Sequence, residues 1–173
     1  MKRLLLLRHA KAAQGSHHGD HARALAPRGR RDAPAMGDAM QAHGLIPDQV
    51  LCSTAARTLE TWELLAPRLK TAPPVALKDG LYLASWNAIL KAVREADDAA
   101  KTLLIIGHNP GIGECGVALS RAPQSDDERA RRDALSAKFP TGALAVLEFD
   151  AGAWRALKPG TAALSAFLTP RNL

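Results

Sequence analysis

The side chains best suited to chemistry on an anion are two histidines and two arginines that follow apolar segments. Arg8 and His9 come directly after a run of four leucines. His108 comes directly after a second apolar segment, and Arg57 lies shortly after a third. The carboxyl ends of parallel strands meet at one edge of a sheet, where ligands of open α/β sheets bind. If the three segments are parallel strands, these four side chains converge on one site.

Such a site suits a phosphoryl group. Two guanidiniums can bind its oxygens through paired, charge-assisted hydrogen bonds, a geometry that lysine does not offer. A neutral imidazole near pH 7 keeps a lone pair for attack on phosphorus, which would give a phosphohistidine intermediate. A second histidine, if protonated, would stabilise the charge of the group in transfer. Helices that begin after Ser53 and after Asn109 would add backbone N–H donors.

Alternating strands and helices are expected to position these residues. Continuous apolar segments predict strands at residues 4–7, 50–52, 75–77 and 102–107, the last of which is also β-branched. Apolar residues at helical spacing predict helices from Arg31 to a stop at Gly44, over 59–69 and over 89–96, with a further helix opened by Pro110. This alternation predicts an α/β protein with a mainly parallel sheet and helices on both faces.

The C-terminal third predicts less regular structure. Residues 121–138 are polar and charged, which indicates a loop or a surface helix. Residues 143–149 and 154–157 are expected to form a closing hairpin joined by residues 150–153. Because neither a repeat nor a linker divides the chain, we expect one domain over residues 1–173.

Composition fits a protein that folds around its own core. The chain has 173 residues, of which 47% are hydrophobic, so a core can form without disulfides. Cys52 and Cys115 lie in apolar surroundings and are expected to be small buried residues, with no zinc or disulfide pattern. The apolar run after Lys2 and Arg3 is too short for a signal peptide, and no segment has the length of a membrane span. We therefore expect a soluble, cytoplasmic protein.

The formal net charge of +6 includes arginine clusters at residues 28–31 and 129–132. A solvated basic surface explains them, and a field that attracts anionic substrates is the alternative. Aromatic residues make up 4% of the chain, and none interleaves with these clusters, which argues against a nucleic-acid surface.

A group of histidines between the first strand and first helix has two interpretations. His17, His18, Asp20 and His21 could form a metal site, but they are adjacent in an expected loop and lack a defined ligand spacing. We therefore interpret them as loop residues at the rim of the pocket, with Asp20 and Arg23 as a local ion pair.

Three motifs in this order resemble the histidine phosphatase superfamily, and more narrowly its small phosphohistidine phosphatase branch of the SixA type. The similarity extends over nearly the whole chain. It rests on residues 7–11 (LRHAK), 51–58 (LCSTAART) and 106–111 (IGHNPG), with further similar segments at 20–25, 28–30 and 139–142.

The resemblance implies a phosphoglycerate-mutase-like fold, no cofactor and no metal. It implies that His9 is the nucleophile, that Arg8 and Arg57 bind the phosphate, and that His108 is the second histidine of the pocket, so all four are predicted catalytic residues. Arg8, Arg57 and His108 are also the predicted substrate-binding residues.

The chain departs from the family's pattern at two points. Ala10 stands where glycine is common, and we expect little effect because a methyl group is small and no positive φ is needed there. The general acid used by the larger branch has no clear counterpart. Asp79 is the only candidate after the expected strand at 75–77, and a surface aspartate is the simpler interpretation.

A missing proton donor favours a labile phosphoryl substrate, because an alkoxide leaving group needs an acid. We therefore predict a metal-independent phosphatase that removes phosphate from phosphohistidine on a protein, acting as a monomer without nucleic-acid or membrane partners. One alternative is a phosphatase or mutase for small phosphate esters such as sugar phosphates. The other is a non-catalytic module that binds phosphate or phosphoproteins.

Overall fold

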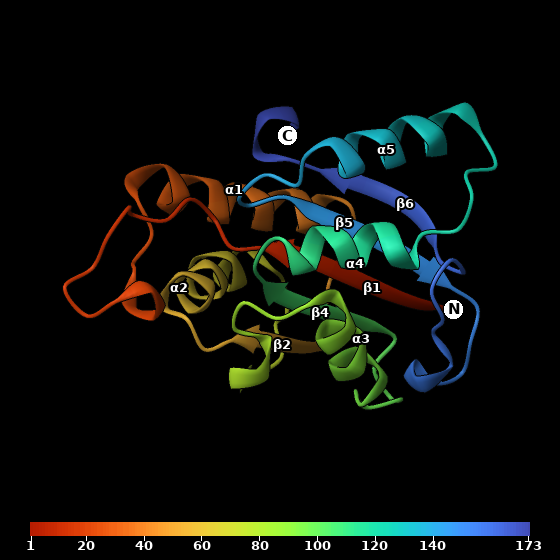
Figure 1. The fold of residues 1–173 in the computed structure, drawn as a ribbon, viewed down its shortest axis with the longest axis horizontal. Coiled ribbons are helices and arrows are strands. Elements are labelled where there is room, and N and C mark those ends of the chain that lie inside the picture. The colour runs from red at the N-terminus through yellow and green to blue at the C-terminus, as the bar shows by residue number, and fades with distance from the viewer.

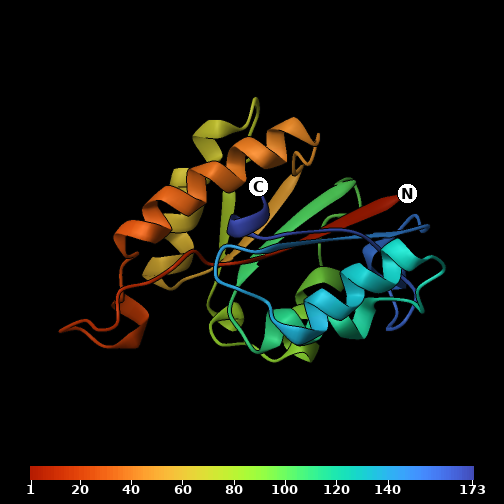
Figure 2. The ribbon, with the colours of Figure 1, turned by 90° about the horizontal axis from the view of Figure 1, so that it is seen from above.

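The computed structural model describes residues 1–173 as a sheet of six strands with helices on both faces (Figures 1 and 2). The strands are β1 (Lys2–Arg8), β2 (Gln49–Ser53), β3 (Val75–Lys78), β4 (Thr102–Gly107), β5 (Leu144–Phe149) and β6 (Ala163–Leu168). The α-helices are α1 (Pro27–Ala42), α2 (Ala56–Leu65), α3 (Trp86–Arg94), α4 (Gly111–Leu119) and α5 (Asp126–Ala137). None of the α-helices combines the length and apolar content that a membrane-crossing helix needs.

The strand order is β3-β2-β4-β1-β5-β6. The first four of these strands pair in parallel, whereas β5 pairs antiparallel with both β1 and β6. The predicted α/β architecture with a mainly parallel sheet is therefore confirmed. In the register of β1 and β4, Arg8 lies opposite Gly107, so the residues that follow both strands, His9 and His108, start at the same edge.

The leucine run of β1 is buried on both sides, as expected of a central strand. Leu4 and Leu6 pack toward α3, α4 and α5 in the larger of the two main core clusters. Leu5 and Leu7 pack toward α1 and α2 in the smaller one. Successive side chains of a strand point to opposite faces, so one apolar segment fills both cores.

Most predicted elements are confirmed, with changed ends. The first helix begins at Pro27 rather than Arg31, because proline suits the first turn of a helix. The second predicted helix ends at Leu65 and continues as a 3₁₀ turn over Ala66–Arg68. The polar stretch near the C-terminus contains the surface helix α5, whose Ser125 caps the N–H of Glu128.

The predicted closing hairpin is wrong in its second half. Residues 154–156 form a 3₁₀ turn, and the partner of β5 is β6, which begins only at Ala163. Trp154 is fully buried and donates its indole N–H to the carbonyl of Ala100. Trp154 and Leu157 are both buried because a spacing of three residues returns to the same side of a 3₁₀ turn.

Candidate active site

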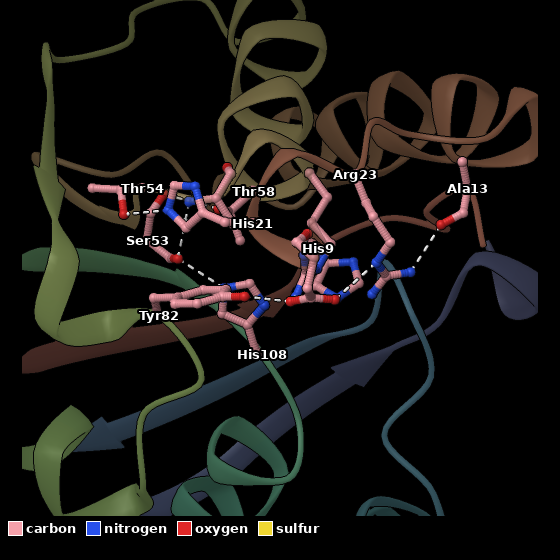
Figure 3. A network of polar contacts seen from close by, with 12 residues as sticks. His9, Ala13, His21, Arg23, Ser53, Thr54, Thr58, Tyr82 and His108 are labelled. Carbon is pink, nitrogen blue, oxygen red and sulfur yellow. Dashed lines mark hydrogen bonds and ion pairs between the residues drawn. The ribbon is translucent and has the colours of Figure 1, made fainter. Parts of the chain in front are cut away.

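The four predicted residues come together where β1, β2 and β4 end. The rings of His9 and His108 lie with their centroids 5.3 Å apart. Both histidines and Arg57 are buried, with 6%, 2% and 2% of the residue exposed. Arg8 is half-buried, and its charge and that of Arg57 act on both imidazoles. Figure 3 shows the two rings side by side.

Hydrogen bonds hold the end of β1 in place. The N–H of Gly142 donates to the carbonyl oxygens of His9 and Arg8, at 2.9 and 3.2 Å. Gly142 has φ +77°, a conformation that glycine adopts without strain. The Arg8 guanidinium donates to the carbonyl of Phe139 at 3.0 Å. Residues 139–142, one of the segments that resemble the family, therefore hold the end of β1 in place through these hydrogen bonds.

His9 has a defined proton position. Its Nδ1 lies 2.7 Å from the carbonyl oxygen of Ala10, and a carbonyl can only accept, so Nδ1 donates. Burial lowers the pKa of His9 to about 4, with the charges of Arg57 and Arg8 acting in the same direction. The ring is neutral at pH 7, and the lone pair of Nε2 is free for attack.

His108 is also neutral at pH 7. Burial lowers its pKa to about 3, and a second ring proton would also be repelled by His9 in its protonated form and by Arg57. Its Nε2 lies 2.7 Å from Oγ of Ser53, at the end of β2. Its Nδ1 is buried and has no hydrogen-bond partner. The condition under which a second histidine would stabilise charge as a cation, a protonated ring, is therefore not met at pH 7 in this site.

Asp20 pairs with the Arg57 guanidinium. The Arg57 guanidinium donates to the Asp20 carbonyl at 2.9 Å and to its carboxylate at 3.2 Å. Arg23 donates to the other carboxylate oxygen at 2.9 Å, which confirms the expected Asp20–Arg23 pair. The hydroxyl of Tyr82 also donates to Asp20. Figure 3 shows part of this network.

These contacts keep Asp20 ionised. The hydrogen bond from Tyr82, with those from Arg23 and Arg57, lowers the pKa of Asp20 to about 2. A carboxylate with this pKa cannot give a proton to a leaving group at pH 7 in this arrangement. An incoming phosphate would share or replace the carboxylate on Arg57.

The other candidates lie at or outside the rim. Asp79 is exposed at the start of a 3₁₀ turn, and no hydrogen bond or ion pair joins its side chain to the site. His21 contacts Oγ1 of Thr54 at 2.9 Å and lies edge-on to Tyr82. His17 and His18 are exposed, and no group of three His, Cys, Asp or Glu side chains is placed to hold a metal.

Sequence reasoning missed two residues of the site. Ser53 was expected only as a strand end, and its position between a strand and a helix N-terminus was the one available signal. Tyr82 is the sole tyrosine of the chain, but nothing near it in the sequence indicates that it reaches Asp20 and His108.

Comparison with known proteins decides the family. A model of the histidine phosphatase superfamily (branch 1) matches residues 4–88, which include Arg8, His9 and Arg57. A solved structure from Nakamurella multipartitia, provisionally assigned as phosphohistidine phosphatase SixA, is 34% identical, with a TM-score of 0.83 and coverage of 98% of this chain and 96% of that one. The chain belongs to the histidine phosphatase superfamily.

Other relatives agree with this membership. A crystal structure from Agrobacterium tumefaciens with the same provisional assignment is 28% identical, with a TM-score of 0.79 and 98% coverage of both chains. An uncharacterized protein of Mycobacterium tuberculosis is 36% identical over 165 residues, which are 95% of this chain and all of the relative. The fold is the phosphoglycerate-mutase-like fold of histidine phosphatases, and membership supports phosphatase activity.

Proposed function

We propose that this protein is a phosphatase that forms phospho-His9 and hydrolyses it without a metal ion. Nε2 of His9 attacks phosphorus, so that the new N–P bond forms as the bond to the leaving group breaks. The leaving group takes a proton from solvent. Water then attacks phospho-His9, loses a proton and releases inorganic phosphate, which regenerates the neutral imidazole.

The observation that carries this proposal is the hydrogen bond from Nδ1 of His9 to the Ala10 carbonyl. It places the proton on Nδ1 and leaves the Nε2 lone pair available beside two guanidiniums. A pKa of about 4 keeps that lone pair unprotonated across the physiological range. A nucleophile of this kind needs no general base.

The guanidiniums of Arg8 and Arg57 support a role in binding the phosphoryl oxygens. Each carries a buried Nε without a hydrogen-bond partner. An anion within reach of these Nε–H groups would give each of them a partner. A phosphoryl group between them would gain charge-assisted hydrogen bonds that strengthen as negative charge develops in the transition state.

For the substrate, we propose phosphohistidine on a protein. Asp20 is ionised and Asp79 lies outside the site, so no carboxylic acid is in place to protonate an alkoxide. An imidazole leaving group reduces that requirement because its ring nitrogen accepts a proton from water readily. The SixA assignment of the two similar structures supports the same substrate class.

The test is to trap the intermediate. A protein carrying ³²P on histidine is mixed with the enzyme and the reaction is quenched within one turnover. We expect label on the enzyme that is stable in alkali and lost in acid. His9→Ala should give none, whereas His18→Ala, which changes an exposed histidine, should match wild type. Equal labelling of His9→Ala would overturn the proposal.

Substrate class is tested by comparing turnover of the phosphorylated protein with turnover of sugar phosphates. Faster hydrolysis of the esters would favour the small-ester alternative, and phosphate binding without any turnover would favour the binding module.

We also propose a monomer, because only Leu77 and Leu83 among the large apolar side chains away from the termini are exposed. Light scattering coupled to gel filtration measures this directly.

A further inference from the structure

The second histidine of the site has one ring nitrogen in contact and one without a partner. Nε2 of His108 lies 2.7 Å from Oγ of Ser53, and Nδ1 is buried with no hydrogen-bond partner in the protein. The two ring nitrogens point in nearly opposite directions, so Nδ1 faces away from Ser53. Figure 3 shows the His108 ring between Ser53 and His9.

The proton of the Ser53 hydroxyl determines which nitrogen of His108 is protonated. Ser53 is fully buried, and its Oγ has two neighbours within hydrogen-bond distance, the N–H of Ala55 at 3.3 Å and Nε2 of His108. The N–H of Ala55 can only donate, so it uses a lone pair of Oγ. Nε2 of His108 is therefore the one acceptor available to the hydroxyl proton.

The opposite arrangement leaves two groups unsatisfied. If Nε2 carried the proton and donated to Oγ, the hydroxyl hydrogen of Ser53 would have no acceptor in a buried site. The lone pair of Nδ1 would also remain buried without a donor. Buried polar groups in folded proteins are nearly always paired, so this arrangement is disfavoured.

We propose that Ser53 is a positioning residue that holds neutral His108 with its proton on Nδ1, directed at the phosphoryl group. His108 then serves as a neutral hydrogen-bond donor rather than as an imidazolium. Its role toward phosphate rests on the proposed function, whereas the position of its proton does not.

The surroundings of His108 favour a neutral donor over a third cation. Arg8 and Arg57 place positive charge near the ring, Asp20 is the one acidic group that acts on it, and His9 is neutral. Tyr82 lies edge-on to the ring, with centroids 5.5 Å apart. A neutral N–H donor stabilises phosphoryl oxygens without a proton being taken up before each turnover.

The position of the proton is measured by NMR on the whole protein labelled with ¹⁵N-histidine. Two-bond couplings from the ring carbon protons distinguish the protonated nitrogen from the unprotonated one. His108 is assigned by the resonance that is lost in His108→Asn. We expect Nδ1–H for wild type at pH 7. An Nε2–H ring in wild type would overturn the proposal, whether or not any variant folds.

Substitution of Ser53 then tests the cause. Ser53→Ala removes the donor to Nε2, so we expect the Nδ1–H preference to be lost and kcat to fall about 10-fold. Ser53→Thr retains the hydroxyl, so it should keep both the Nδ1–H preference of His108 and the wild-type kcat. A merely structural role would lower stability in Ser53→Ala without moving the proton, and an unchanged His108 spectrum in Ser53→Ala would also overturn the proposal.

The same experiments separate this proposal from the proposed function. An Nδ1–H ring in a protein that never hydrolyses phosphohistidine would support the positioning role and reject the substrate. A labelled His9 together with an Nε2–H His108 would support the phosphatase and reject the role of Ser53.

Discussion

His9 and His108 occupy equivalent places in the fold and are held in opposite ways. Each follows a central parallel strand, each is buried and neutral, and their rings lie 5.3 Å apart. A backbone carbonyl fixes the proton of His9 on Nδ1, which leaves a lone pair on Nε2. A hydroxyl bonds Nε2 of His108, which leaves Nδ1 for donation. The different hydrogen-bond partners of the two rings thus underlie the two proposed roles, with His9 as the nucleophile and His108 as a hydrogen-bond donor.

Substitution of His9 should have the largest effect on turnover. Neither amide in His9→Asn or His9→Gln supplies a nucleophilic lone pair, so we expect turnover to fall on the order of 10⁴-fold or more, with no phosphoenzyme. Initial rates and the trapped label measure this. Acid-labile label on either variant would mean that another residue is the nucleophile.

Loss of Arg57 should have the next largest effect and should act on both rings. We expect Arg57→Ala to lower turnover about 10²-fold or more, as for removal of one transition-state donor. Attack requires unprotonated His9, so wild-type turnover rises with pH through a pKa of about 4. The Arg57 charge lowers this pKa, so the rise should move to higher pH in the variant.

The control for Arg57 is Arg68→Ala, which changes an exposed arginine paired with Asp38. Its turnover and pH profile should match wild type. An Arg57→Ala enzyme whose turnover rises at the wild-type pH would show that this charge does not act on His9.

At His108, in contrast to His9, substitution by asparagine and substitution by glutamine should lower turnover by different amounts. The amide nitrogen of asparagine takes the place of Nδ1, whereas that of glutamine takes the place of Nε2. We expect about a 10-fold loss of turnover for His108→Asn and about 10²-fold for His108→Gln. The reverse order would show that the ring acts through Nε2.

The smallest effect is expected at the support of His9. Oγ1 of Thr61 accepts the N–H of Ala10 at 3.0 Å and donates to the Arg57 carbonyl at 2.7 Å. Thr61→Val leaves a buried N–H unpaired, so it should lower the free energy of unfolding by about 1–3 kcal/mol and turnover by less than about 10-fold. Thr61→Ser and Ala10→Gly keep the hydrogen bond, so their free energy of unfolding, measured with urea, should differ little from that of wild type.

Local sequence patterns predicted the elements that carry the site. The leucine run before Arg8 and the β-branched segment before His108 indicated buried strands because a strand covered on both faces needs continuous apolar residues. Parallel pairing then placed their ends at one edge. The prediction was wrong for Trp154, because an apolar pair three residues apart suits a 3₁₀ turn as well as a short strand. Pairing of β5 with β6 depends on contacts along the whole sheet.

Residue types and their positions at or shortly after strand ends by themselves predicted two imidazoles and two guanidiniums together, and hence the proposed site for a phosphoryl group. Only the tertiary structure decided the hydrogen-bond partners from which the proposed role of each imidazole is argued. The proton position of His108 depends on a hydrogen bond with Ser53, 55 residues away in the sequence. That of His9 depends on how the backbone orients the carbonyl of its neighbour Ala10, and burial keeps both rings neutral. Asp20 and Tyr82 likewise meet 62 residues apart, a contact that no local pattern can encode.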